Sequence, residues 1–254
     1  MNNENNTIQT ALITTMDQAH PRVSAKYQVV PTRMIAQKFT DLGFKLDEYK
    51  SVRVRDASRI GYQKHFVRLS HPTLLTTKHN DVKLQLLVTN SHDGSSSFSI
   101  KLGIFRLVCS NGLVVGTTFE SVTLRHTGRI LEEIDGAVER MVAQTKKLDD
   151  YLAQMKSRTL TPDEIQSFYE KSVKVRYGDK VSANDVSIIA LRPEDNSTDL
   201  FTVYNRVQEA LIRGSQVRGL NGRMRQRRGI TNITKDVSIN EKLFDLATEY
   251  LQVA

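Results

Sequence analysis

The chain has 254 residues, of which 39% are hydrophobic and 25% are charged, a composition ordinary for a soluble globular protein. No apolar run approaches the roughly 20 residues that a membrane-spanning helix needs, and the polar start MNNENNTIQT is unlike a secretory signal. A single cysteine excludes an internal disulfide bond. We therefore expect a cytoplasmic protein with no membrane partner.

The formal net charge of +8 is more informative about partners. An excess of Lys and Arg attracts polyanions and speeds their association. The charge favours nucleic acid as the partner, and the alternative is a basic surface with no such role.

The N-terminal third predicts a tail and a short helix. Residues 1–24 are rich in Asn and Thr and predict a disordered tail. Residues 31–43 predict a helix, because Pro31 suits a helix start, apolar residues recur on one face and Gly43 suits its end.

Alternating apolar residues then predict an antiparallel β-meander. The expected strands cover residues 51–55, 62–69, 82–88, 98–109, 113–115 and 119–124, with a bulge or bend at Gly103.

Helical periodicity begins after the strands. Apolar residues recur every three or four positions over 130–155 and predict one long helix, which would cover the apolar face of the sheet. Further helices are predicted from a capping box at Thr161, over 198–213, and from Asn240, read as an N-cap. The expected fold class is α+β, with a disordered tail (1–24), an α+β core (25–158) and a helical C-terminal region (159–254).

Residues 213–228 form an Arg-rich loop without an acidic residue. Three glycines argue against a firm helix, and arginine binds phosphate at two points and stacks on bases. We expect nucleic-acid contacts here, and the alternative is a solvated loop or one paired with acidic residues. The candidate binding residues are Arg213, Arg218, Arg223, Arg225, Arg227 and Arg228.

A second basic set lies on the predicted strands and at the start of the long helix. Tyr62 and Phe66 alternate with basic residues there, so the set could form a groove that follows phosphates while aromatic rings stack on bases. The alternative is that the aromatic rings pack in the core and the arginines face water. The basic members are Arg53, Arg55, Arg59, Lys64, Arg68, Arg125 and Arg129.

The evidence for an enzyme is weak. His92 and Asp93 could act as acid and base, but Asp93-Gly94 is also typical of a tight turn. Cys109 lies in an apolar strand and is expected to be a buried small side chain. Neither nucleotide-binding nor metal-binding spacing is found in the sequence, so we expect no cofactor and no metal.

Several segments resemble a known family. They are similar to the phage/plasmid-like family, whose domain has no known function. The similar segments are residues 89–116, the sequence Thr127-Gly-Arg-Ile, residues 200–211 and the stretch that begins at Asn240. The resemblance covers most of residues 25–252. It implies a bacterial protein encoded by a phage, a plasmid or an integrated element.

The order of elements also resembles the core of single-strand annealing recombination proteins. That resemblance implies a homo-oligomer, in the form of a ring, that binds single-stranded DNA without ATP or metal. We therefore expect a protein that binds and anneals single strands and also contacts duplex DNA. The alternatives are an interaction protein that antagonises a host defence system, and a hydrolase or nuclease centred on His92 and Asp93.

Overall fold

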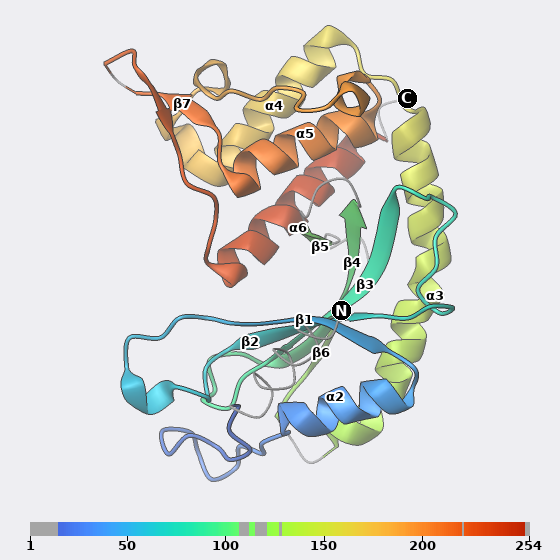
Figure 1. The fold of residues 1–254 in the computed structure, drawn as a ribbon, viewed down its shortest axis with the longest axis vertical. Coiled ribbons are helices and arrows are strands. Elements are labelled where there is room, and N and C mark those ends of the chain that lie inside the picture. Colours follow the sequence, from blue (N-terminus) through green and yellow to red (C-terminus); the bar gives the residue numbers. More distant parts are fainter. Residues whose placement is uncertain (1–14, 107–111, 115–120, 127–128, 220, 252–254) are drawn as a thin grey trace. The chain divides into compact units, whose positions relative to one another are not determined.

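The computed structural model describes residues 15–106, 112–114, 121–126, 129–219 and 221–251 (Figure 1). The chain divides into two compact units, which are described separately below. The first comprises Met1–Lys78, Lys83–Ile104 and Phe119–Thr145, and the second comprises His79–Val82, Phe105–Thr118 and Lys146–Ala254. The fold contains helices and an antiparallel sheet, so the expected α+β class is confirmed.

The main sheet follows the order of the chain. Its strands lie in the order β1-β2-β3-β4-β5, and β6 pairs with β4. The described pairings β1–β2, β2–β3 and β4–β6 are antiparallel. The strand bounds are Lys45–Ser51 for β1, His65–Ser70 for β2, Val82–Asn90 for β3, Phe98–Arg106 for β4, Gly112–Val114 for β5 and Val122–Leu124 for β6.

The strand expected at residues 51–55 is placed wrongly. β1 ends at Ser51, and the alternating residues 52–55 follow it. The N–H of Val52 still donates to the carbonyl of Lys64, at 2.9 Å. Asp56 then caps a short 3-10 helix, Ala57–Arg59, and this turn ends the pairing with β2.

The centre of the sheet is covered on both faces. In β3, the expected apolar face is buried, and so are the intervening residues Gln85, Leu87 and Thr89. β4 runs through Gly103 without interruption. The last residues expected in that strand, 107–109, lie outside the described part of the chain.

The first unit also contains α2, Thr32–Asp41, and the start of α3, Ile130–Ser157. Phe39 of α2 and Ile134 of α3 are fully buried, and Lys38 forms a 2.9 Å ion pair with Asp135 between the two helices. The long helix expected over 130–155 is thus confirmed.

The second unit is mainly helical. Three helices contact one another: α4 (Pro162–Tyr177), α5 (Leu200–Arg213) and α6 (Ile233–Glu249) (Figure 1). A short hairpin pairs β7 (Gln216–Arg218) with β8 (Met224–Gln226). The capping box expected at Thr161 is present: its hydroxyl accepts from the N–H of Glu164, whose carboxylate accepts from the N–H of Thr161. None of the helices among the described residues is long and apolar enough to cross a membrane.

The last helix begins earlier than expected. Asn232 is its N-cap, with a side chain that accepts from the N–H of Lys235 at 3.0 Å. Asn240 lies in the helix interior, 1% exposed, and accepts a 2.7 Å hydrogen bond from Gln208. A buried partner on α5 therefore explains this asparagine, and the capping prediction for it is wrong.

Residues 15–24 of the expected tail belong to the first unit and contact the rest of it. The N–H of Met16 donates to the carbonyl of Gly61 at 3.0 Å, and the N–H of His20 donates to that of His92 at 2.8 Å. Residues 1–14 lie outside the described part of the chain.

Candidate functional site

The Arg-rich segment folds as a β-hairpin, called here the arginine hairpin (residues 213–228). Val217 pairs with Arg225 at the centre of β7 and β8. The ladder extends at both ends, because Arg227 donates its N–H to the carbonyl of Ser215 and Gly219 donates to that of Arg223, each at 2.9 Å. The segment expected to be a loop is therefore ordered by backbone pairing.

This pairing sets three arginines in a row. Arg225 lies in β8, and Arg223 and Arg227 flank it in the extended ladder, so the three share one face of the hairpin and follow each other at about 7 Å. All three are exposed. Successive phosphates of an extended nucleic-acid strand have a comparable spacing, so the row suits a polyanion.

Two glycines allow the backbone to cross closely at the base of the hairpin. Gly214 has φ +99°, and a Cβ there would collide with the carbonyl oxygen of Arg227. A Cβ on Gly229 would lie 2.5 Å from the carbonyl oxygen of Arg213. The N–H of Ile230 donates to the carbonyl of Ile212 at 2.7 Å and completes the crossing.

The hairpin arginines differ in their partners. Arg218 lies 3.7 Å from Asp185, and Arg213 lies 3.1 Å from Glu209. The exposed side chains of Arg223, Arg225, Arg227 and Arg228 form no ion pair within the described ranges. Their charges are consequently available to an external anion.

Arg213 belongs to a structural network. Glu209 is almost fully buried and accepts from Arg213 and, at two points, from Arg192 at 2.9 and 3.0 Å. Arg192 also pairs with buried Asp195. The hydrogen bonds with Glu209 raise the pKa of Arg192 above its ordinary value, so it stays charged.

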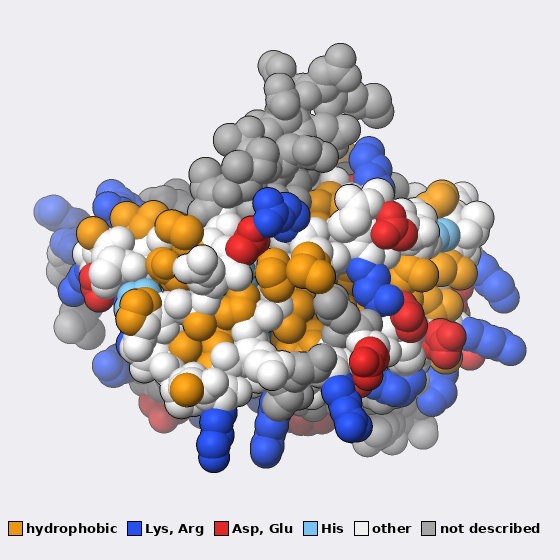
Figure 2. Space-filling view, turned by 90° about the horizontal axis from the view of Figure 1, so that it is seen from below, with side chains coloured by type: hydrophobic (Ala, Val, Ile, Leu, Met, Phe, Trp, Pro, Cys, Tyr) orange, Lys and Arg blue, Asp and Glu red, His pale blue; other side chains and the backbone are white. Residues whose placement is uncertain are grey.

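The basic set of the first unit does not form one strip of free charge. Arg68 pairs with Glu48 at 2.8 Å, and Lys64 lies 5.2 Å from the centre of the Phe66 ring. Arg53 and Arg55 are exposed beyond the end of β1. On the side of α2, Lys and Arg side chains lie around the edge of a face that has hydrophobic side chains at its middle (Figure 2).

The two aromatic residues proposed to stack on bases occupy different environments. Phe66 is 4% exposed within β2, which does not suit stacking on a base. Tyr62 is half-buried, and its ring meets that of His20 edge-on at 5.1 Å. Both rings contribute to packing of the first unit.

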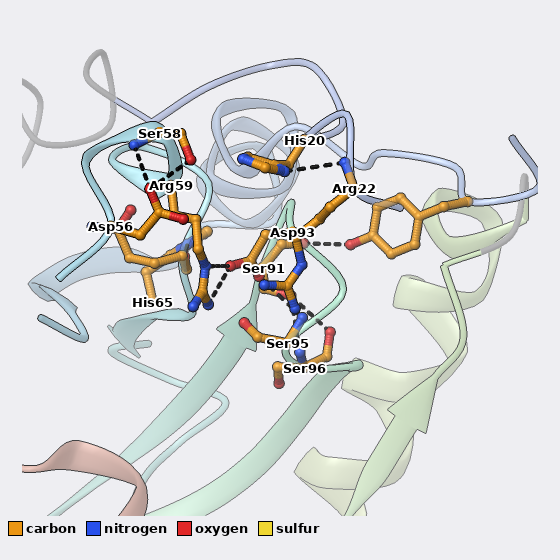
Figure 3. A network of polar contacts seen from close by, with 12 residues as sticks. His20, Arg22, Asp56, Ser58, Arg59, His65, Ser91, Asp93, Ser95 and Ser96 are labelled. Carbon is orange, nitrogen blue, oxygen red and sulfur yellow. Dashed lines mark hydrogen bonds and ion pairs between the residues drawn. The ribbon is translucent and has the colours of Figure 1, made fainter. Parts of the chain in front are cut away.

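Arg59 forms an ion pair with Asp93, which lies in the connection between β3 and β4. Its Nε and Nη2 donate to one carboxylate oxygen at 2.8 and 2.6 Å, and Figure 3 shows the two side chains pointing toward each other. The other oxygen accepts from the N–H of Ser95 at 3.0 Å. Burial raises the pKa of Asp93, but these hydrogen bonds outweigh it and the pKa is lowered overall.

His92 belongs to a buried polar cluster. Its Nε2 lies 3.3 Å from both Thr32 Oγ1 and Asn90 Nδ2, and the hydroxyl of Thr32 lies 2.5 Å from Nε2 of His65. Burial lowers the pKa of His92 and lowers that of His65 to about 4. These neutral rings hold α2 against the sheet.

The geometry of His92 and Asp93 fits a structural role. Both are 0% exposed, and Asp93 binds Arg59 instead of His92. The described ranges contain no group of three His, Cys, Asp or Glu side chains placed to hold a metal ion. Cys109, the other candidate nucleophile, lies outside those ranges.

A polar pocket of about 530 Å³ lies beside the connection between β3 and β4. Exposed Lys26 and Arg125 contribute two cations, and Ser24, Ser95, Ser96 and Ser97 contribute hydroxyls. Sequence reasoning identified Arg125 but missed Lys26, which joins it only through the fold. Arg129 is exposed just before α3.

The comparisons with known proteins agree with the resemblance noted in the sequence. A family model described as "Domain of unknown function (DUF932)" matches residues 19–243. UPF0380 protein YafZ and UPF0380 protein YfjQ of Escherichia coli (strain K12) are each 32% identical over 236 residues, which cover 91% of this chain and 85% of the relative. No solved structure matches. The expected membership is confirmed: the chain belongs to the DUF932 family, a domain family without a known function.

Proposed function

We propose that the protein binds single-stranded DNA, with the arginine hairpin as the main contact. The observation that carries the proposal is the row of Arg223, Arg225 and Arg227, exposed on one face of the arginine hairpin and without acidic partners among the described residues. Such a row displaces counterions from a phosphate backbone, and arginine side chains also stack on bases.

Single strands suit this surface better than a rigid duplex. The three arginines lie along β8 and the paired residues that flank it, and a flexible single strand can extend along this row while its bases turn outward. Bases left accessible in this way can pair with a second strand. Annealing by a homo-oligomeric ring in the bacterial cytoplasm, without ATP or metal, is the activity that we propose on the further support of the resemblance to annealing proteins.

Fluorescence anisotropy with labelled 20-nucleotide single strands and the corresponding duplex, each at two salt concentrations, tests the binding proposal. We expect tighter binding to the single strand and a marked loss at the higher salt concentration. The R223A/R225A/R227A variant should bind at least about tenfold more weakly, because three phosphate contacts are lost. Salt-independent binding, or no binding by the native protein, would contradict the proposal.

Native mass spectrometry with and without the oligonucleotide tests the assembly. A defined oligomer that binds one strand across several subunits would support annealing. A monomer that binds DNA but does not accelerate pairing of complementary strands would limit the function to DNA binding.

A further inference from the structure

A pocket of about 360 Å³ lies in the second unit, beside the base of the arginine hairpin. This volume is within the range of small-molecule sites. The pocket combines apolar, amide and charged groups from three segments: the loop before α5, α5 itself and the hairpin. The lining includes Ile189, Leu191, Arg206, Ala210, Gln216 and Gln226.

The apolar part of the pocket is unusually exposed. Ile189 is 60% exposed and Leu191 is 59% exposed, although both are large aliphatic residues. A scattered exposed aliphatic side chain needs no explanation, but two that line one pocket indicate a surface that is covered by a ligand. A flat apolar group would bury both.

The hairpin supplies the amide groups. Gln216 and Gln226 lie directly opposite each other in the β7–β8 ladder, on the face away from the arginine row. Glutamine side chains can form paired hydrogen bonds with the edge of a nucleobase. One face of the hairpin thus offers cations for phosphates, while the other offers two amides that line the pocket.

Among the described residues, one cation that lines the pocket has no acidic partner. Glu209 is neutralised by Arg192 and Arg213, as described above. Arg206 forms no ion pair within the described ranges, and its Nε is buried without a hydrogen-bond partner there. An unsatisfied buried guanidinium nitrogen carries a free-energy cost, which an anionic ligand would remove.

We propose that this pocket binds one unpaired nucleotide of a DNA strand held by the arginine hairpin. The base contacts Ile189 and Leu191, its edge meets the amides of Gln216 and Gln226, and a phosphate of that nucleotide binds Arg206. This inference rests on the proposed binding of single-stranded DNA and adds to it a site for the base.

Two probes separate the base from the phosphates. The affinity of the full-length protein is measured for a single-stranded oligonucleotide and for an abasic oligonucleotide with the same number of phosphates. We expect the native protein to prefer the base-bearing strand by about tenfold, the ratio that corresponds to one well-packed base. The I189S/L191S variant should bind both probes with nearly equal affinity, and its exposed substitutions should leave folding intact.

Two further variants make the result specific. I60S/L74S replaces exposed aliphatic residues of the first unit and should keep the native preference for bases. R223A/R225A/R227A should weaken binding of both probes and keep their ratio.

The outcomes separate the two proposals. Equal native affinity for both probes overturns the base pocket while DNA binding stands. A native preference that persists in I189S/L191S also overturns it and leaves the pocket to another occupant, such as an apolar protein segment. If the native protein binds neither probe, the proposed function fails and the base pocket fails with it.

Discussion

Arg59 and Asp93 are joined by two hydrogen bonds to the same carboxylate oxygen, at 2.8 and 2.6 Å, although 34 positions separate them in the sequence. Asp93 is completely buried, whereas the Arg59 side chain is 25% exposed. The pair ties the short turn after β1 to the connection between β3 and β4. The ion pair therefore stabilises the fold of the first unit.

Removing one member of this pair should destabilise the protein. We expect Asp93→Asn to lower the free energy of unfolding by about 3 kcal/mol, because the partly buried Arg59 side chain loses its counter-charge. Urea unfolding followed by circular dichroism measures the change. In the double variant Arg59→Met with Asp93→Asn, the loss should be smaller than the sum of the two single losses. Strictly additive losses would show that the ion pair contributes little.

The salt dependence of DNA binding should report the number of phosphates held by the hairpin. For single strands, each phosphate contact contributes about −0.7 to the slope of log affinity against log salt concentration, so R223A/R225A/R227A should make the slope shallower by about 2. Anisotropy titrations at four or more salt concentrations give this slope.

The control for that experiment removes the same charge elsewhere in the second unit. Lys146, Lys147 and Lys174 are exposed helix residues outside the hairpin. K146A/K147A/K174A should retain the native slope within about 0.7, that is, one phosphate contact. If both triple variants reduce the slope of log affinity against log salt concentration equally, then binding depends on net charge and not on the hairpin.

Gly229 at the backbone crossing and Gly136 within α3 should respond in opposite ways to a Gly→Ala substitution. Gly229→Ala should destabilise by about 1–3 kcal/mol, because the added Cβ would lie 2.5 Å from the backbone oxygen of Arg213. Gly136→Ala, within α3, meets only Arg140 Nη1 at 3.7 Å and should stabilise by about 0.5–1 kcal/mol. Thermal unfolding of the two variants checks both signs. A stabilising Gly229→Ala would show that the backbone crossing is looser than described.

Two asparagines of the last helix should differ in their contributions to stability. Asn232→Ala removes an exposed N-cap and should cost about 1 kcal/mol. Asn240→Leu removes a buried acceptor and leaves the amide of Gln208 without its 2.7 Å partner, which should cost about 1–3 kcal/mol plus the strain of a bulkier side chain. Urea unfolding of both variants ranks the two costs. A larger cost for Asn232→Ala would restore the capping residue as the main determinant.

The buried histidines predict a loss of stability in mild acid. The pKa of His65 is about 4 in the folded protein, compared with 6.5 for an unperturbed histidine, so the unfolded chain takes up a proton first as the pH falls. Stability should be full above about pH 6.5 and should decline toward pH 4, by about 3 kcal/mol from His65 alone. His92 and His126 act in the same direction, because burial lowers their pKa values too.

Melting temperatures between pH 7.5 and 4.5 test this expectation. His65→Gln should be less stable than the native protein at pH 7.5 but should show a shallower decline below pH 6.5. A native melting temperature that is constant between pH 7.5 and 4.5 would show that the buried histidines do not lower stability in acid.

Local signals were sufficient to predict most helices. Pro31 marks the start of α2, and the Thr161 capping box marks that of α4, because both effects depend on a few adjacent residues. β1 was misplaced, since the alternation at 52–55 continues after the pairing with β2 has ended. Asn240 was misread for a related reason: an asparagine suits a cap and also suits a buried hydrogen bond, and only the position of α5 distinguishes the two.

The candidate sites depended more on tertiary structure. The sequence identified the six arginines but could not place three of them in a row, because the hairpin register depends on pairing across residues 215–227. Arg59 and Arg68 resembled free cations until their partners Asp93 and Glu48 were located. The pocket beside Ile189 combines segments distant in sequence and has no local signal.

The close backbone crossing at Gly214 and Gly229 also separates the hairpin from the helices that it joins. Both strands leave from one point, so the chain enters and departs at nearly the same position whatever lies between. Insertions or deletions between Asn221 and Arg223, at the β8 end of the turn, should then leave α5 and α6 undisturbed. The hairpin is in this sense a separable module, because its two ends are fixed together at the base by Gly214 and Gly229.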